Sequence, residues 1–284
     1  DVLESKALTE VLGACLSCKA CKKECPSNVD VSLLKAELLH ARQQKYGVPL
    51  RERLISRFDS LGRIGTLMPA ATNAVLGARG TRLVMDKLIG FSAKRPFPQY
   101  AHERFDVWFA KRTSSARATR GRVILWDDCS TRYHEPAVGV AAVKVLESAG
   151  YDVILAHGHK CCGRPAFSVG RLDVARQAGA HNVALLMQTD RDAPVVFLEP
   201  SCYSMFKGDY RELNIPDADA VSARSVLFEQ FVHALLEREP DALAFGAPSG
   251  AVAVHTHCHA KALSNTNILP QLLSRLPASS VTML

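Results

Sequence analysis

The sequence lacks any run of about 18 apolar residues, so no part of it is expected to cross a membrane as a helix. It also lacks the G-x-G-x-x-G fingerprint of dinucleotide-binding folds and the G-x-x-x-x-G-K-[ST] loop that cradles phosphates, and we therefore assign it no nucleotide site. Aromatic residues make up only 7% of the chain and do not alternate with its basic residues. Nucleic acid is therefore not an expected partner.

The cysteines do not form an even set that could close a framework of disulfides. There are nine of them in 284 residues, and Cys161 and Cys162 are adjacent. Because disulfide-rich secreted chains pair their cysteines, this pattern favours reduced thiols and a cytoplasmic protein. The length and the hydrophobic content of 48% allow two domains with cores of their own.

Four of the cysteines lie within eleven residues, in the pattern Cys15-x-x-Cys18-x-x-Cys21-x-x-x-Cys25-Pro26. Bacterial ferredoxins hold 4Fe–4S clusters with this spacing, because soft thiolates bind iron and two-residue gaps direct several sulfurs from one loop at one cube. The alternative is structural zinc, which usually takes two separated C-x-x-C pairs. The spacing therefore predicts a 4Fe–4S site.

Cys25 raises the question of a second run. In two-cluster ferredoxins the cysteine before proline ligates the other cluster, and this chain has a single Cys-Pro. The sequence begins at Asp1 within what reads as a helix, Val2 to Leu12. We expect the matching run to lie upstream of Asp1.

The net charge is +7, and many basic residues fall in the first third of the chain and between positions 94 and 122. We interpret the second group as a solvated linker surface, with docking to an acidic partner or to an anionic membrane face as alternatives. Lys19, Lys22 and Lys23 lie inside the cysteine loop. They are either exposed loop lysines or residues that offset the negative charge of a thiolate-bound cluster.

Apolar spacing predicts helices in the first hundred residues, at Val2–Leu12, Val31–Tyr46, Pro49–Leu61, 67–77 and 80–89. Asp30 is a good N-cap for the second of these helices, and Gly47 ends it. The residues from Ser92 to Gly121 are rich in proline, arginine and serine, which is typical of a linker.

After residue 121 the pattern alternates between strands and helices. Strands are predicted at 123–126, 153–155, 195–198 and 252–255, and helices at 136–149, 172–187, 222–236 and 260–276. Alternation of this kind indicates a parallel sheet. The predicted fold class is α + α/β: an all-helical ferredoxin-like domain (1–91), a basic linker (92–120) and an α/β cysteine-rich domain with a mostly parallel sheet (121–245).

The remaining cysteines follow the predicted strands. Cys129 comes after the first strand, Cys161 and Cys162 after the second, Cys202 after the third and Cys258 after the fourth. Open parallel sheets bind ligands at the carboxyl ends of their strands, so these thiols can converge on one point. Buried free cysteine as a small hydrophobe would explain one or two of them. We predict that all five ligate a metal or a cluster.

Several other polar residues flank these cysteines: His157, His159, His255, His257 and His259. They could ligate zinc, tune or protonate a neighbouring group, or simply pack. Arg164, which follows Cys161-Cys162-Gly163, either binds a carboxylate, stabilises the charge of a cluster or lies on the surface.

Three motifs in order resemble one family. They are the cysteine run with its Ser-Asn-Val-Asp extension, then Cys161-Cys162-Gly163-Arg164-Pro165, and then Glu-Pro-Ser-Cys followed by His-Cys-His-Ala-Lys-Ala-Leu. Together they resemble the C-terminal iron–sulfur region of FAD-linked D-2-hydroxyacid dehydrogenases of the D-lactate and D-2-hydroxyglutarate type. Related segments occur in iron–sulfur subunits of anaerobic glycerol-3-phosphate dehydrogenase and glycolate oxidase, and in heterodisulfide reductase.

The resemblance implies an oxidoreductase part that transfers electrons through 4Fe–4S clusters. FAD in a dehydrogenase domain or subunit outside these residues would oxidise the hydroxyacid, so the catalytic residues would lie there. The acceptor would be a quinone, a cytochrome or another electron-transfer protein, reached in the cytoplasm or at the cytoplasmic face of the membrane by peripheral association.

The resemblance also assigns the cysteines to motifs. Cys15, Cys18, Cys21 and Cys25 match the ferredoxin-type ligands, and Cys129, Cys161, Cys162 and Cys202 match a first cysteine-rich repeat. Cys258 matches the opening cysteine of a second repeat, over 246–284.

Two features depart from the family pattern: Cys202 is not followed by the second cysteine of a C-x-x-C pair, and the second repeat has no Cys-Cys-Gly of its own. We expect both ends of the chain to be cut.

Two other functions compete with electron transfer. In the first, a heterodisulfide-reductase-like subunit would use Cys161, Cys162 and Cys202 for thiol–disulfide chemistry on a substrate. In the second, the protein would be a non-enzymatic scaffold that binds zinc.

Overall fold

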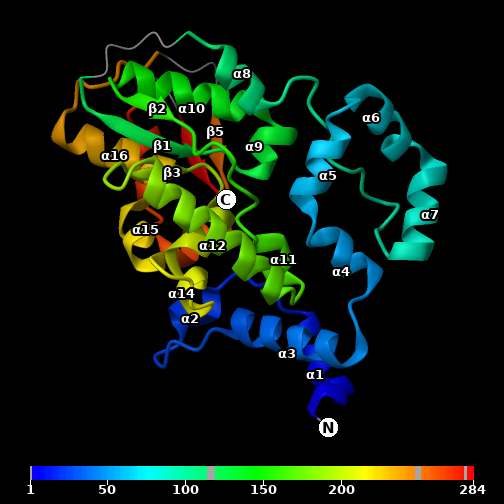
Figure 1. Cartoon of the computed structure of the whole chain (residues 1–284). Helices are drawn as coiled ribbons and strands as arrows, with labels where there is room; N and C mark the ends of the chain where they lie inside the picture. The colour runs from blue at the N-terminus through cyan, green and yellow to red at the C-terminus, as the bar shows by residue number, and fades with distance from the viewer. Residues whose placement is uncertain (1, 114–118, 247–250, 278–279) are drawn as a thin grey trace.

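The computed structural model of this chain describes residues 2–113, 119–246, 251–277 and 280–284. Figure 1 shows an N-terminal helical segment at the bottom, a helical arm at the right and an α/β body that carries the sheet. The predicted α + α/β class is confirmed. Among the described residues, no helix combines the length and the apolar character that a membrane span requires.

The N-terminal segment is built from short helices and one long one. Its elements are η1 (Val2–Glu4), α1 (Lys6–Gly13), α2 (Ala20–Glu24) and α3 (Val31–Tyr46). The long helix begins and ends where the sequence predicts, because the Asp30 side chain accepts hydrogen bonds from the backbone N–H groups of Ser32 and Leu33. Gly47 follows the helix with a φ of 85°, which glycine adopts without strain.

Residues 50–89 form the helical arm, which contains α4 (Leu50–Ile55), α5 (Phe58–Gly65), α6 (Pro69–Gly77) and α7 (Arg79–Ile89). The single helix predicted from Pro49 to Leu61 is therefore divided in two. Helix α5 approaches the rest of the chain closely through two glycines. A Cβ at Gly62 would lie 2.4 Å from the Tyr133 ring, and one at Gly65 would lie 2.4 Å from the ring of Tyr100.

The body contains a four-stranded parallel sheet in the order β2-β1-β3-β4. Its strands are β1 (Arg122–Trp126), β2 (Asp152–Ile154), β3 (Val195–Phe197) and β4 (Ser225–Leu227). The helices between and around them are α8 (Phe105–Lys111), α9 (Cys129–Tyr133), α10 (Pro136–Ser148), α11 (Arg164–Ser168), α12 (Leu172–Thr189), α13 (Pro200–Ser204), η2 (Met205–Asp209, a π-helical segment), α14 (Tyr210–Glu212), α15 (Ala218–Arg224) and α16 (Phe228–Arg238).

The two faces of the sheet are covered by different helices, and strand β1 shows this clearly. Val123 and Leu125 pack into a core cluster with residues of α8 and α10. Ile124 and Trp126 pack into another, with residues of α12 and η2. Because successive strand residues point to opposite faces, both faces are apolar and buried, as a parallel sheet requires.

Three of the elements expected after residue 121 are placed differently by the structure. The helix expected over 222–236 is interrupted by β4, because Ser225 and Leu227 pair with β3 and are buried. The expected fourth strand, now β5 (Val252–Val254), pairs instead with β6 (Val281–Met283) in a separate two-stranded parallel sheet. The helix expected over 260–276 is two short helices, α17 (Cys258–Leu263) and α18 (Ile268–Leu273).

The expected linker also contains structure. Within 92–120, helix α8 inserts Phe105 and Phe109 into the core beside α10, and Phe105 is completely buried. The interpretation of that whole segment as solvated linker surface is therefore wrong for α8. The apolar spacing of Phe105, Trp108 and Phe109 is the sequence signal of this buried helix.

Candidate metal centres

Three adjacent strands deliver four cysteines to one edge of the sheet. Cys129 is the first residue of α9, and Asp128 caps that helix by accepting hydrogen bonds from Ser130 and Thr131. Cys161 and Cys162 lie in the connection from β2 to α11, and Cys202 lies in α13, directly after β3. The convergence expected from the sequence is confirmed for these four, which we call the four-thiol site.

The sulfur atoms of the four-thiol site contact one another in series. The thiol of Cys161 interacts with that of Cys129 on one side and with that of Cys162 on the other. The sulfurs of Cys162 and Cys202 lie 3.0 Å apart. Cys162 and Cys202 are buried, whereas Cys129 and Cys161 are partly exposed.

Buried polar groups hold the Cys161–Cys162 connection in place. The side-chain amide of Asn182, a fully buried residue of α12, donates to the carbonyl oxygens of Lys160 and Cys161, both at 3.1 Å. Its oxygen accepts a hydrogen bond from Lys160 N at 2.8 Å, and the Tyr210 hydroxyl donates to Cys162 O at 2.7 Å. Neither residue was identified from the sequence.

Four neighbouring thiols, two of them buried, cannot all ionise unaided, and their pKa values reflect this. Contact with Cys161 and burial raise the pKa of Cys129, and contacts with Cys161 and Cys202 together with burial raise that of Cys162. The contact with Cys162 favours the Cys202 thiolate, but burial and nearby carboxylates raise the pKa of Cys202 to about 11. Hydrogen bonds from its two neighbours lower the pKa of Cys161. A thiophilic metal group would supply the positive charge that four thiolates need, so the donor set fits such a group.

The residues from Cys15 to Cys25, which we call the N-terminal cysteine loop, run into α2 and beyond it. Ser17 and Lys19 have left-handed backbone, with φ of 55° and 63°, which turns the chain sharply. Cys15 Sγ accepts a hydrogen bond from Ser17 N at 3.4 Å. Backbone N–H groups of Val29 and Ser27 bond to Cys25 and lower its pKa, an arrangement that favours a thiolate. All four cysteines of this loop are partly exposed.

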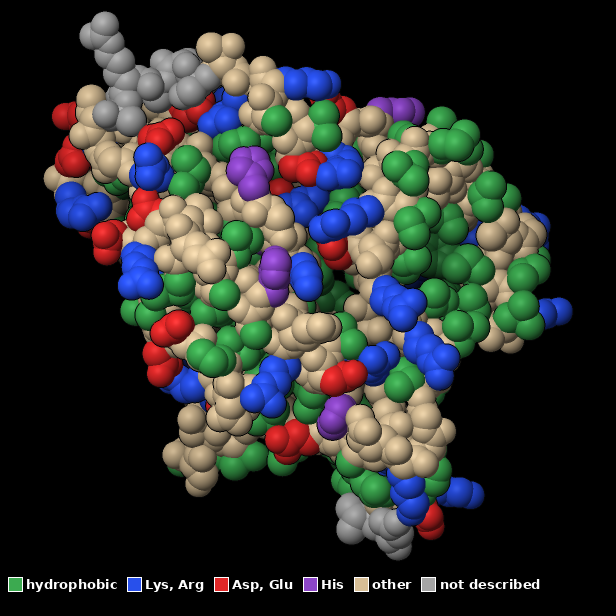
Figure 2. Space-filling model, in the orientation of Figure 1, with side chains coloured by type: hydrophobic (Ala, Val, Ile, Leu, Met, Phe, Trp, Pro, Cys, Tyr) green, Lys and Arg blue, Asp and Glu red, His purple; other side chains and the backbone are tan. Residues whose placement is uncertain are grey.

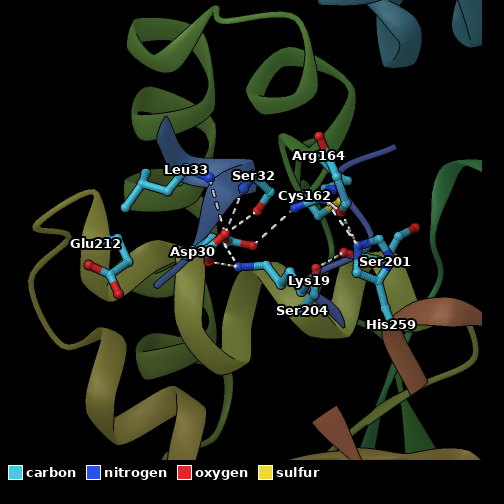
Figure 3. A network of polar contacts seen from close by, with 12 residues as sticks. Lys19, Asp30, Ser32, Leu33, Cys162, Arg164, Ser201, Ser204, Glu212 and His259 are labelled. Atoms are coloured by element: carbon cyan, nitrogen blue, oxygen red, sulfur yellow. Dashed lines mark hydrogen bonds and ion pairs between the residues drawn. The ribbon is translucent and has the colours of Figure 1, made fainter. Parts of the chain in front are cut away.

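A buried polar network joins the N-terminal cysteine loop to the four-thiol site (Figure 3). Lys19 Nζ lies 2.9 Å from Asp30 Oδ2 and 2.6 Å from Asp209 Oδ1. Arg164 donates to Asp209 Oδ2 at 3.2 Å and to Ser17 O at 2.6 Å. These side chains are buried, and that of Asp209 is completely inaccessible. Arg164 therefore binds a carboxylate, as one of its interpretations stated, and Lys19 is not an exposed loop lysine.

Cys258 follows a strand of the second sheet and not of the four-stranded one. It begins α17 and is exposed. Its sulfur lies 4.0 Å from His257 Nδ1. Within the described part of the chain, His257, Cys258 and His259 are the group of three candidate ligands whose atoms all lie within 4.8 Å of one another.

The other histidines have different surroundings. His159 is buried and bonded to Ala156 O and Asp127 O, and burial together with the charge of Arg132 lowers its pKa to about 3. This is a packing role. His157 lines a polar cavity of about 380 Å³ beside β2, and His255 is exposed.

Comparison with known proteins relates the chain to cysteine-rich domains and to dehydrogenases. Residues 123–207 match the family model described as a cysteine-rich domain, CCG. The chain is 25% identical over 264 residues to a subunit of the anaerobic glycerol-3-phosphate dehydrogenase of Escherichia coli K12. It is 23% identical over 290 residues to the D-2-hydroxyglutarate dehydrogenase of Pseudomonas putida KT2440, and 28% identical over 159 residues to the lactate utilization protein A of Bacillus cereus G9842.

These alignments cover unequal shares of the proteins. They include 91%, 98% and 54% of this chain, respectively. The chain spans 65% of the glycerol-3-phosphate dehydrogenase subunit, 28% of the D-2-hydroxyglutarate dehydrogenase and 63% of the lactate utilization protein. No solved structure matches the chain.

Proposed function

We propose, from the cysteine-rich domain match over 123–207 and from the relatives named above, that the chain is the iron–sulfur electron-transfer part of a dehydrogenase. One observation carries the proposal: the N-terminal cysteine loop and the four-thiol site meet at a buried contact. Ser17, next to Cys18, accepts a hydrogen bond from Arg164, which is two residues after Cys162. Covalent and hydrogen bonds therefore connect the two sets of thiols by a short path.

The cysteines would hold the clusters as follows. Cys15, Cys18 and Cys21 would bind one 4Fe–4S cluster, and Cys25 would serve a second, ferredoxin-type partner cluster. Cys129, Cys161, Cys162 and Cys202 would bind a cluster at the sheet edge, and Cys258 would contribute to a further metal site. Iron–sulfur clusters supply one-electron redox chemistry when bound.

The protein's own contribution is to fix and shield these ligands. The network of Lys19, Asp30, Asp209 and Arg164 closes the interface with two cations and two carboxylates, so it leaves no unbalanced buried charge. Asn182 and Tyr210 orient the Cys161–Cys162 connection. Rigid ligands and a dry interface are what one-electron exchange between two sites requires.

We further propose that the electrons come from FAD in a dehydrogenase domain or subunit that acts on a D-2-hydroxyacid. The names of the Pseudomonas and Bacillus relatives support this substrate class, whereas that of the E. coli relative names glycerol 3-phosphate. Anaerobic affinity purification of the chain from cells tests the proposal. We expect a flavoprotein to co-purify and to bleach the visible absorbance of the chain when D-lactate or D-2-hydroxyglutarate is added; reduction by glycerol 3-phosphate alone would contradict it.

We also propose peripheral association with the cytoplasmic face of a membrane, through the helical arm. The arm carries seven basic residues and three acidic ones between positions 50 and 89. It also exposes large apolar side chains, among them Ile64, Leu67, Met68, Leu83 and Leu88. Figure 2 shows hydrophobic side chains gathered over this part of the molecule. A cationic, apolar helical surface suits an anionic bilayer, and co-sedimentation with anionic but not with zwitterionic vesicles is the expected result.

The test of the central proposal is metal loading. Protein reconstituted anaerobically with iron and sulfide should be coloured, and dithionite should bleach it. Cys18→Ser and Cys202→Ser should each remove a different part of the iron, because they belong to different sites. Ser17→Ala is the control, since Ser17 enters the network through its backbone carbonyl. Colourless protein with stoichiometric zinc would instead establish the scaffold alternative.

Thiol–disulfide chemistry is the second candidate function. Cys161 lines a cavity of about 510 Å³ together with Arg57 and Lys160, so a substrate could reach it. Its neighbours also lower its pKa, which favours a nucleophilic thiolate. Turnover of a small disulfide that Cys161→Ser abolishes would support this function.

A further inference from the structure

An apolar cavity lies between the helical arm and the body. Its volume is about 570 Å³, within the usual range for sites that bind small organic molecules. Its walls include Phe58, Leu61, Leu76, Met85, Phe91 and Phe97. Figure 2 shows a hollow in the hydrophobic surface on this side of the molecule.

The polar groups of this cavity are few and specific. His134 lines the wall, and its Nδ1 lies 2.9 Å from the carbonyl oxygen of Gln99. A carbonyl can only accept, so Nδ1 carries the proton and Nε2 is left as an acceptor. Nε2 is buried and has no hydrogen-bond partner. Thr72 also lines the cavity, and its hydroxyl can donate.

The lining also determines which ligands fit. It contains no lysine, arginine, aspartate or glutamate, so nothing in it would pair with the phosphates of a flavin or a nicotinamide cofactor. Aromatic rings surround the acceptor: the His134 ring lies 4.8 Å from that of Tyr100 and 5.9 Å from that of Phe58. A flat, uncharged ring with one hydroxyl or carbonyl at each end would fill the cavity, stack on these side chains and satisfy both polar groups.

The cavity is adjacent to the four-thiol site. Pro165 forms part of its wall, and Pro165 is only three residues after Cys162. Because consecutive Cα atoms are 3.8 Å apart, the Cα atoms of these two residues are separated by no more than about 11 Å. On its outer side, the arm that encloses the cavity carries the exposed apolar and basic side chains described above.

We propose that this cavity binds a quinone or hydroquinone ring, with a hydroquinone hydroxyl donating to His134 Nε2 and the Thr72 hydroxyl donating to the oxygen at the other end. The inference rests on the proposed electron-transfer function, because a redox-active ring beside the four-thiol site is useful only if that site exchanges electrons. The inference names a quinone as the electron acceptor and places its binding site in the cavity between the helical arm and the body.

Binding to the chain without iron provides the test. Calorimetric titration with decylubiquinone and with its hydroquinone should give saturable binding at one site, and decanol, which has the tail but no ring, should bind at least roughly tenfold more weakly. Leu76→Trp fills the cavity and should weaken binding of the ring by roughly tenfold or more. Val84→Trp adds the same side chain on the same arm, at a position that is 55% exposed and outside the cavity, and should leave binding unchanged.

A second pair of variants tests the polar contact without filling the cavity. The amide of His134→Asn can reproduce the Nδ1 donor to Gln99 but leaves no acceptor at the Nε2 position, so the hydroquinone should bind about fivefold more weakly. His134→Gln, whose amide reaches the Nε2 position, should retain more of the affinity.

Two outcomes would overturn the inference: equal binding of decanol, which would indicate a site for acyl chains, or equal affinity in Leu76→Trp and the wild type. Either result is independent of the proposed function, because iron content and bleaching by dithionite are measured separately.

Discussion

Gly163 has a conformation and a position that strongly disfavour any side chain. Its φ is 85°, and a Cβ there would lie 3.1 Å from the Cα of Ala175 and 3.2 Å from its carbonyl oxygen. Both of these atoms belong to the backbone of α12, so they cannot rotate away as the end of a flexible side chain can. The third residue of the Cys-Cys-Gly motif is therefore glycine because α12 passes directly beside the thiols.

Gly163→Ala should lower both stability and iron content. Left-handed backbone alone costs an alanine about 1 kcal/mol, and the contact with α12 should add about 1–2 kcal/mol and displace Cys162. Gly158→Ala is the matched control, since Gly158 has the same φ of 85° but open space around its Cβ position. Urea denaturation and iron analysis of both variants measure the difference. Equal losses would show that the passage of α12 beside the thiols is irrelevant.

At the scale of elements, α8 decides where the α/β body begins. Phe105 is completely buried, and a Cβ on Gly139 of α10 would lie 2.6 Å from its ring. The helix is thus packed tightly against α10. It belongs to the core of the body, although the residues around it are rich in basic side chains.

Phe105→Ala should destabilise the protein by about 3–5 kcal/mol, because it leaves a cavity in the core. Val107→Ala, in the same helix at a position that is 38% exposed, should cost under about 1 kcal/mol. Thermal or urea unfolding compares the two variants. Similar small effects would restore the interpretation of this whole segment as a linker.

The elements that the sequence predicts well are those with strong local signals. Helix α3 has Asp30 at one end and Gly47 at the other, and β1 and β3 are short runs of large apolar residues. Strand β4 was missed because it is three residues long and lies between two helices, so its pattern merges with theirs. Only pairing with β3 makes it a strand, and pairing partners cannot be identified from a local pattern.

At the scale of the whole molecule, the N-terminal segment and the body are joined by buried charges. Lys19 and Asp209 are 190 residues apart in the sequence, yet their side chains are 2.6 Å apart. The convergence of the four cysteines in the body could be predicted because they follow three adjacent strands. The Lys19–Asp209 pair could not, because Asp209 belongs to no motif and the proximity of the two residues exists only in the folded chain.

Asp209→Asn should loosen this junction. It keeps the size of the side chain but leaves Lys19 and Arg164 with too little negative charge in a buried place, which should cost about 3 kcal/mol. Asp219→Asn removes a carboxylate from an exposed pair with Arg211 and should cost under about 1 kcal/mol. Urea denaturation gives both values, and limited proteolysis between positions 26 and 60 should become faster only in the first variant. An Asp209→Asn protein as stable as the control would show that the junction does not depend on these charges.

The strand order β2-β1-β3 has a consequence for biosynthesis. The ribosome delivers the N-terminal cysteine loop before the four-thiol site, and the central strand emerges before both of its neighbours. During translation of the intervening residues, the early thiols have neither their shielding body nor their counterparts, and they are open to oxidation. A cluster therefore cannot be inserted into the four-thiol site of the nascent chain before β3 and Cys202 have emerged from the ribosome. A cell that makes this protein in air has to protect the free thiols until then.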